Sequence, residues 1–550
     1  MLGGILLTIG ADLRGQEQQY PDFSTAATLR AIRVSTRDIF EREKARDNLL
    51  FRIANTLHAT TDSDVVWREI WFEPGDRVSL DEVAELERNL RAMRLFGEAQ
   101  VRLVDAGGGQ ADLDVQTRDR FSLLFGGGAG TVGGVTKFSG TIGDRNLFGT
   151  GKQITVNADQ EEENSSFDVR YDDPQLFGSW YQASVTVGDA TEGPFGSISV
   201  WRPFKHLEDP WSYGFAASTV DREIDYYDRS DVVASVPEDR REASVFALRG
   251  FGPRDLRGHI GPDLRYRQSS YDQTTGPQPG FVTAPGDTEE FQLGLDFGVD
   301  WVSEYRVERR IDTIDFDEDV RLGIFVNSRL ALAHREEAGR GSNLQPLLEL
   351  DARFAASPLP DTYTTFWFEG GLRWQDGRRL AHRTRTAFHL FQKSLPSQTL
   401  GLSLLFDEAV DRQDLRPQLT LGEDNGLRGY PARRFASDRY LLLNIEDRID
   451  TGLELWSIHI GLAGFVDVGW IDDPGQRRNW SDPLRSVGVG LRLGSSELVG
   501  DGVVRIDFAW PLDDADGESF DLSISASRAQ VFGFFGNALE LTSEFESFFR

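Results

Sequence analysis

The sequence predicts a mainly β chain, in which a closed antiparallel sheet over residues 121–550 follows one small α+β domain over residues 28–120. Two observations predict this fold class. A helical spacing of apolar residues is present only before about residue 120, and after it apolar and polar side chains alternate with the period of two that is typical of strands. The chain also has no apolar run of about 18 to 20 residues, the length that a membrane-spanning helix needs.

Residues 1–27 precede the first predicted strand. The opening MLGGILLTIG has a short apolar core but no basic segment before it. We interpret residues 1–27 either as the remnant of a signal peptide whose start lies upstream or as a disordered N-terminus.

The domain predicted over residues 28–120 has the order β-α-α-β-β. Ser79 and Glu82 have the spacing of a capping box, and the apolar residues that follow form one stripe along a helix. The expected elements are a strand at 29–40, helices at 63–72 and 79–96, and strands at 99–104 and 111–117. About ninety residues of this pattern are enough to bury one small core.

After residue 120, segments of alternating hydrophobicity are separated by turns of unequal length, which suits a closed antiparallel sheet. The clearest segments are 152–159, 181–188, 197–204, 291–302, 321–333, 364–374, 399–406, 457–470, 486–494, 503–510 and 520–527. The alternative is a large soluble β protein. A propeller lacks support because no blade period repeats, and the many aromatic residues among the apolar positions favour a lipid-facing belt.

Composition excludes several functions. Lys and Arg number 59 against 89 Asp and Glu, so the net charge of −30 argues against nucleic-acid binding. The excess acid suits a solvated surface; the acidic clusters at 315–319 and 513–518 lack the full spacing of a calcium loop. The absence of cysteine excludes disulfides, thiolate nucleophiles and cysteine-ligated metals. We expect no metal site and no cofactor; the alternative is that the acidic loops bind divalent cations.

Motifs of enzymes are also missing. A literal G-x-G-x-x-G occurs at Gly128, Gly130 and Gly133, but an alternating, glycine-rich stretch follows it rather than a helix, which predicts a tight hairpin. The sequence contains no G-x-S-x-G and no H-E-x-x-H, and its seven histidines lack the spacing of metal ligands. We expect a protein that is not an enzyme.

The stretch EDNGLRGYPARRF (423–435) lies between two predicted strands and places a cation on a glycine-hinged loop. Its centre, Gly426, Leu427, Arg428, Gly429 and Tyr430, resembles the VRGF/Y motif of the outer-membrane insertase and translocase superfamily of BamA, TamA and the two-partner-secretion transporters. Three further stretches are similar to that superfamily in the same order. They are the glycine-rich hairpin with its N-x-x-G-T-G turn at 126–156, YDDPQLFG at 171–178, and GFVDVGWI at 464–471.

The resemblance implies a transmembrane barrel of sixteen strands preceded by one POTRA-like domain. It implies that the loop folds into the lumen, where Arg428 pairs with Asp467 of the F-x-D-x-G motif formed with Phe465 and Gly469. Glu446, in the next strand, is a weaker candidate partner. The pair has two interpretations: an ion pair that only holds the barrel in shape, or a part of the working cycle.

The resemblance also implies a lateral seam between the first strand, beginning near Phe121, and the last, at about 520–529. Gly126, Gly127, Gly128 and Gly130 lie in that first strand. Glycine loses more entropy on ordering than other residues, so this seam is expected to open most easily. An open seam offers unpaired backbone groups to an incoming strand.

These expectations describe a bacterial outer-membrane factor, with its N-terminal domain in the periplasm, that inserts or translocates β-rich clients. The alternatives are a dedicated two-partner-type secretion pore and a passive structural barrel. The implied partners are unfolded outer-membrane or secreted clients, outer-membrane lipid and lipopolysaccharide, and periplasmic chaperones or accessory subunits. The chain departs from the pattern in having room for one POTRA domain and in continuing beyond the expected last strand.

Overall fold

A computed structural model describes residues 26–39, 58–132, 135–161, 164–314, 317–411, 418–455, 458–472, 480–494, 503–513 and 521–527. Its elements are β1 (Ala26–Arg37), α3 (Ser63–Trp67), β2 (Arg77–Ser79), α4 (Leu80–Ala92), β3 (Phe96–Gly107), β4 (Gln110–Asp119), β5 (Leu123–Val132), β6 (Val135–Asp144), η1 (Leu147–Gly149), β7 (Gln153–Glu161), β8 (Asn164–Asp173), η2 (Leu176–Gly178), β9 (Gln182–Ala190), β10 (Gly193–Arg202), β11 (Trp211–Asp228), β12 (Asp231–Phe251), β13 (Leu256–Tyr271), β14 (Thr288–Glu308), β15 (Glu318–Glu337), β16 (Gly341–Leu359), β17 (Thr362–Gln375), β18 (Arg378–Gln392), β19 (Gln398–Asp411), β20 (Leu419–Leu421), η3 (Glu423–Asn425), β21 (Phe435–Ser437), β22 (Arg439–Leu455), β23 (Ile458–Ile471), β24 (Leu484–Gly494), β25 (Val503–Pro511) and β26 (Asp521–Ser527).

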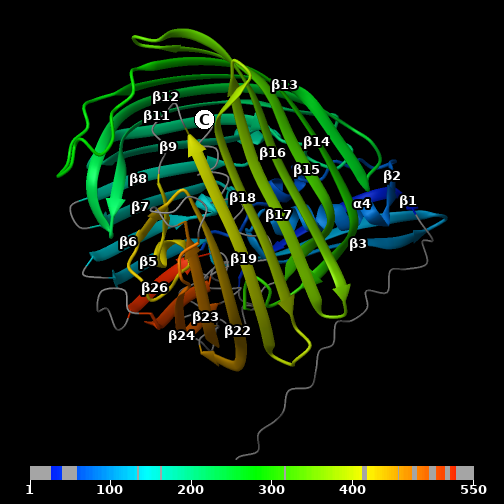
Figure 1. The fold of residues 1–550 in the computed structure, drawn as a ribbon. Coiled ribbons are helices and arrows are strands. Elements are labelled where there is room, and N and C mark those ends of the chain that lie inside the picture. Colours follow the sequence, from blue (N-terminus) through cyan, green and yellow to red (C-terminus); the bar gives the residue numbers. More distant parts are fainter. Residues whose placement is uncertain are drawn as a thin grey trace, which may run out of the picture. The chain divides into compact units, whose positions relative to one another are not determined.

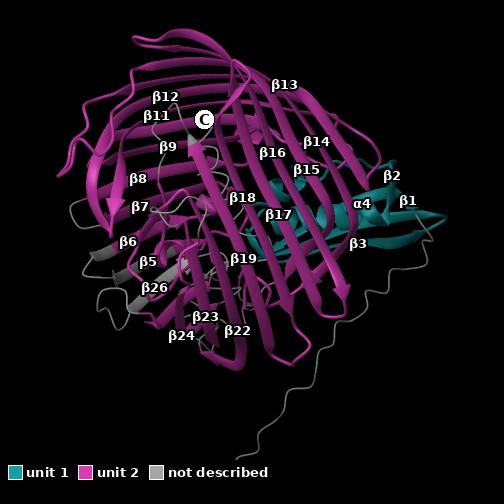
Figure 2. Ribbon diagram, viewed as in Figure 1, with its two compact units in different colours: residues 1–37, 62–119 teal, residues 38–61, 120–550 magenta. Residues whose placement is uncertain are grey.

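The chain forms two compact units, coloured separately in Figure 2. Unit 1 contains residues 1–37 and 62–119, and unit 2 contains residues 38–61 and 120–550. The domain predicted over 28–120 is continuous, whereas unit 1 leaves out residues 38–61. Of the segment 1–27 that was predicted as a signal remnant or a disordered start, residues 1–25 lie outside the described residues, and Ala26 and Ala27 begin β1.

Unit 1 is a four-stranded sheet in the order β2-β1-β4-β3, with β1 parallel to β4, packed against α4. The capping box is confirmed, since the Glu82 N–H donates to Ser79 Oγ (3.3 Å) and Glu82 accepts from the Ser79 N–H (2.8 Å). The first predicted helix was too long. It ends at Trp67. Pro74 disfavours helical backbone in the residue before it, and the chain turns there and enters β2, a short strand that was not predicted.

Unit 2 is a closed antiparallel barrel whose order runs from β5 to β19 and then from β22 to β26, as Figure 1 shows for most of its strands. In the described part of the chain this makes twenty strands, so the predicted count of sixteen was wrong. An even number is required, because β26 closes on β5 in antiparallel orientation. The count of sixteen came from the resemblance and not from the alternation. Long strands such as β11 and β12 have polar stretches, including Glu238–Glu242, and were not among the clearest alternating segments.

The barrel wall has an apolar outer face and a polar inner face. On β14, the side chains of Phe291, Leu293, Leu295, Phe297, Val299 and Trp301 are exposed, whereas Glu290 and Gln292 between and beside them are buried. Ten residue steps at about 3.4 Å, tilted by about 40°, give an apolar band of roughly 25 Å. This height is that of the outward-facing band of membrane barrels.

None of the described helices is long and apolar enough to cross a lipid bilayer.

The first and last barrel strands meet in a short register. β26 pairs with β5 only through Leu522–Ile524 and Ala129–Thr131 in the described residues, whereas β5 pairs with β6 along its full length. Gly128 and Gly130 of the literal G-x-G-x-x-G lie in β5, which pairs with β6 in antiparallel orientation up to Val132 and Val135, whereas Gly133 lies outside the described residues. Residues 528–550, which include the predicted tail, lie outside the described residues.

Candidate functional site

The predicted arginine loop lies between β19 and β22 and carries the small hairpin of β20 and β21. Leu421, Leu427 and Tyr430 of the loop are buried against Tyr440 and Leu442 of the adjoining wall. Apolar packing therefore holds the loop against the inside of the barrel.

Two glycines let the loop place its arginine. Gly426 (φ +96°) and Gly429 (φ +87°) are in the left-handed region, which L side chains rarely adopt. A Cβ on Gly429 would lie 3.2 Å from the Pro511 nitrogen and 3.4 Å from the Cβ atoms of Ala509 and Ser486. The glycines that flank Arg428 thus supply both the turn and the close approach to β24 and β25.

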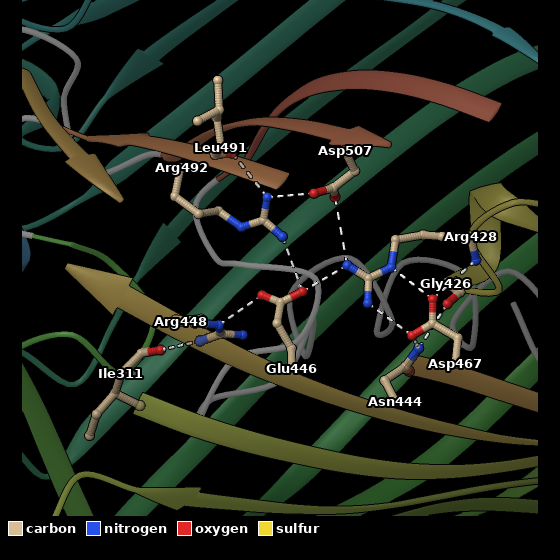
Figure 3. A network of polar contacts seen from close by, with 10 residues as sticks. All are labelled: Ile311, Gly426, Arg428, Asn444, Glu446, Arg448, Asp467, Leu491, Arg492 and Asp507. Carbon is tan, nitrogen blue, oxygen red and sulfur yellow. Dashed lines mark hydrogen bonds and ion pairs between the residues drawn. The ribbon is translucent and has the colours of Figure 1, made fainter. Parts of the chain in front are cut away.

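Arg428 is buried and binds two carboxylates on the wall (Figure 3). Its Nε and Nη2 donate to Asp467 Oδ2 and Oδ1, each at 2.8 Å, and its Nη1 donates to Glu446 Oε2 at 2.7 Å. The Arg428 N–H also donates to Asp467 (3.3 Å), and Nη1 lies 3.6 Å from Asp507 Oδ2. The forked contact to Asp467 uses the planar geometry of a guanidinium, which lysine lacks.

Further residues extend this contact into a network (Figure 3). Asn444 Nδ2 donates to Asp467 Oδ1 (2.7 Å) and to the Gly426 carbonyl (2.8 Å), which ties the loop backbone to the same carboxylate. Arg492 donates to Asp507 (2.5 Å) and to Glu446 (3.1 Å), and Arg448 donates to Glu446 (2.9 Å). We call Arg428, Arg448, Arg492, Glu446, Asp467 and Asp507 the lumen network.

The lumen network contains three cations and three carboxylates and is therefore balanced in charge. All six side chains are buried, so solvent screens them less than it would at a surface. Burial by itself lowers the pKa of Arg428, but the carboxylates of Asp467, Glu446 and Asp507 outweigh burial and raise that pKa above its ordinary value. Arg428 therefore stays charged.

The alternation of side chains along β23 directs every second residue of this strand into the lumen. Phe465, Asp467 and Gly469 alternate along β23 and all face the lumen. The Arg428 guanidinium lies 3.3 Å above the centre of the Phe465 ring, a cation–π contact. Two inward glycines supply space, since a Cβ on Gly488 would lie 2.1 Å from the Phe465 ring and one on Gly469 would lie 2.8 Å from Leu421.

The loop also contacts the opposite side of the lumen. The Tyr227 N–H donates to Gln418 Oε1 (2.6 Å), Arg434 Nη1 donates to the Arg229 carbonyl (3.0 Å), and the Arg433 guanidinium lies 5.0 Å from the Tyr227 ring centre. A cavity of about 430 Å³ remains beside the loop, between β11 and β18. The loop thus bridges the lumen and leaves part of it open.

The structure brings together the residues that the motif predicted. Asp467 is the bidentate partner of Arg428, and Glu446, the weaker candidate, is also a direct partner. The prediction did not include Asn444, Arg448, Arg492 and Asp507. The alternation along β22, β24 and β25 could have shown that these side chains face the lumen. It could not have shown the strand register that aligns them with Arg428.

The predicted seam glycines and the acidic clusters lie outside the lumen network. Gly126, Gly127, Gly128 and Gly130 lie in β5, the strand that meets β26. The acidic clusters at 315–319 and 513–518 lie partly outside the described residues. Within the residues that the structure describes, no group of three or more His, Asp or Glu is arranged to hold a metal ion.

No protein-family model matches the chain, and no curated protein matches it. Solved structures with a similar fold include CdiB from Acinetobacter baumannii, at 11% identity over 91% of this chain and 73% of that chain, with a TM-score of 0.42. CdiB from Escherichia coli covers 91% of this chain and 76% of its own at 11% identity, with a TM-score of 0.43. BamA from Haemophilus ducreyi, in a form lacking POTRA domains 1–3, covers 91% of this chain and 85% of its own at 11% identity, with a TM-score of 0.39.

Proposed function

We propose that this chain is an outer-membrane barrel that inserts or translocates β-rich client proteins through a lateral opening between β5 and β26. The observation that carries the proposal is the short register between these two strands. Only Ala129–Thr131 and Leu522–Ile524 are paired at the seam in the described residues, whereas β25 and β26 pair from Val503–Ser527 to Ala509–Asp521. Among the described residues, opening the seam therefore breaks fewer backbone hydrogen bonds than separating β25 from β26.

The apolar band on the outer face of β14 supports a membrane location. Its height of roughly 25 Å matches the hydrocarbon layer that a barrel spans, and the buried charges line the lumen, away from lipid. Under this proposal, unit 1 would act as a POTRA-like domain in the periplasm. Periplasmic chaperones or accessory subunits would deliver clients there.

The chemistry of the opening is backbone pairing. Once β26 leaves β5, each strand exposes a row of unpaired N–H and C=O groups. An extended client strand can satisfy them by adding to the sheet edge. The client leaves when its own strands pair more completely than the temporary seam, so the process needs no nucleotide and no cofactor.

The arginine loop would stabilise the closed form of the lumen. It joins β22, β23 and β25 through Arg428 and reaches β11 through Gln418, so it holds opposite walls together. We expect Arg428→Ala and Asp467→Ala variants that still reach the membrane but work poorly.

A dedicated secretion pore for one exported protein is the second candidate function. The cavity beside the loop and the polar lining of the lumen favour it, because a translocated chain would need a hydrated path. A passive structural barrel would be neither an insertase nor a pore.

The test is to lock the seam. The chain contains no cysteine, and Gly130 and Ser523 are register partners across the seam, so Gly130→Cys/Ser523→Cys is the locking pair. Gly128→Cys/Ser139→Cys, register partners within the β5–β6 hairpin, is the control. Folding of an unfolded barrel client into liposomes is followed by gel mobility without heating.

An insertase accelerates client folding when reduced and loses the acceleration only in the oxidised seam pair. A secretion pore gives no general acceleration and continues to move its own substrate with the seam locked. A barrel without any client effect in either state is passive.

A further inference from the structure

The turn between β14 and β15 folds into the barrel from the end opposite to the arginine loop. Because neighbouring strands alternate in direction, β14 ends at the rim where β5 begins, whereas the loop after β19 enters from the other rim. We call residues Arg310–Ile314 the lumen turn. Ile311 and Ile314 are buried although they belong to a connection between strands.

A single carboxylate shapes the lumen turn. Glu318 accepts hydrogen bonds from the backbone N–H groups of Ile311 (3.2 Å), Asp312 (2.8 Å) and Thr313 (3.0 Å) and from the Thr313 hydroxyl (2.8 Å). Three consecutive amides directed at one carboxylate fold the turn back on the start of β15. The turn therefore has a defined conformation that depends on Glu318.

Packing seats the lumen turn against distant strands. Ile311 lies in a buried cluster with Val320, Leu322, Ala355, Tyr363 and Phe391. The Thr399 hydroxyl on β19 donates to the Arg310 carbonyl (2.9 Å), and Ile314 faces Gly494 on β24, where an added Cβ would lie 3.2 Å from the Ile314 Cβ. The turn thus crosses the lumen from β14 and β15 to β19 and β24.

Arg448 joins the lumen turn to the lumen network. Its Nε donates to Glu446 Oε1 (2.9 Å), while its Nη1 donates to the Ile311 carbonyl (2.7 Å), as Figure 3 shows. Glu446 is also the carboxylate that accepts from Arg428 on the arginine loop. A continuous path of charged contacts therefore runs from Arg428 through Glu446 and Arg448 to Ile311.

We propose that the lumen turn is a second closure of the barrel lumen, and that Arg448 couples it to the arginine loop. The proposal rests on the proposed function only in assuming that the lumen opens during work. When Arg428 leaves Glu446, that carboxylate keeps its contacts with Arg448 and Arg492. The Arg448 guanidinium is then drawn fully to Glu446 and releases the Ile311 carbonyl. Arg448 is a positioning residue, because it acts on the turn and touches no client.

A reversible lock tests the closure. In Ile314→Cys/Gly494→Cys the Cβ added at position 494 would lie 3.2 Å from the Cβ at position 314, so the two must move apart by a few tenths of an ångström to reach the separation of about 3.5 to 4.5 Å that a disulfide requires. Conductance across planar bilayers is compared before and after reduction. The oxidised pair is expected to lose the opening steps that the reduced pair shows, and Glu318→Ala is expected to open more often. Glu336→Ala, an exposed position on the same strand, is the control.

Coupling through Arg448 is tested with the double variant. Arg428→Ala and Arg448→Ala are each expected to raise the open fraction, and the combined variant is expected to add little beyond either one, since both act on one path. Additive effects would overturn the coupling. Equal conductance in the oxidised and reduced disulfide pair would overturn the closure, whatever the client assay shows. Loss of client folding with intact, lock-sensitive conductance would instead contradict only the proposed insertase function.

Discussion

Replacing Arg428 by lysine separates the forked guanidinium contact from its charge. Arg428 donates hydrogen bonds to Asp467 from two of its nitrogens and to Glu446 from the third. A lysine ammonium is a point charge and cannot hold both carboxylates in this geometry. We expect Arg428→Lys to recover less than half of the loop stability that Arg428→Ala loses.

The magnitude follows from burial. Asp467 and Glu446 are both 0% exposed, so removing Arg428 leaves three buried carboxylates with two cations. Breaking one partner of a buried pair costs about 3 to 5 kcal/mol. The remaining cations, Arg448 and Arg492, compensate in part, so we expect about 3 kcal/mol for docking of the loop, or roughly a hundredfold change in its equilibrium.

Hydrogen exchange of the loop amides measures this equilibrium. The Leu427 N–H donates to the Gly422 carbonyl (2.9 Å) and the Glu423 N–H donates to the Tyr430 carbonyl (3.1 Å), so both are protected while the loop is docked. Protection is expected to fall roughly a hundredfold in Arg428→Ala. Arg433→Lys, at a partly exposed arginine of the same loop, is the control. Unchanged protection in Arg428→Ala would refute the reasoning, because the loop would then be held by apolar packing alone.

Three other outcomes are expected. Gly488→Ala places a Cβ within 2.1 Å of the Phe465 ring and should lower loop protection without changing any charge. Ser79→Ala removes one side of the capping box and should destabilise unit 1 by about 1 kcal/mol, measured by urea-dependent exchange of α4 amides. The hydrogen bond from Arg30 lowers the pKa of Asp112, so its contribution to stability is present above the ordinary aspartate pKa and is lost as the pH falls through the lowered value. Asp112→Asn should flatten this acid dependence of exchange in β1 and β4, and an unaltered acid profile would contradict it.

The sequence by itself determined the local features of this protein. Period-two alternation located strands such as β14, β23 and β25, and the Ser79–Glu82 spacing predicted a capping box that the structure confirms. These features depend on residues within a few positions of one another. The pairing of Arg428 with Asp467 also came from the sequence, through a motif and not through periodicity.

Only the tertiary structure decided how the strands combine. The number of barrel strands depends on where long polar segments such as Glu238–Glu242 pair, and pairing is a property of two distant segments. The same holds for Arg492 and Asp507. Arg492 reaches Glu446, and Asp507 reaches Arg428, only because the register of β24 and β25 aligns both residues with the loop. Ile311 lies 137 residues from Arg448, so no local pattern could place the lumen turn under the lumen network. Alternation states which face a side chain occupies, whereas closure of the barrel decides which side chains share that face.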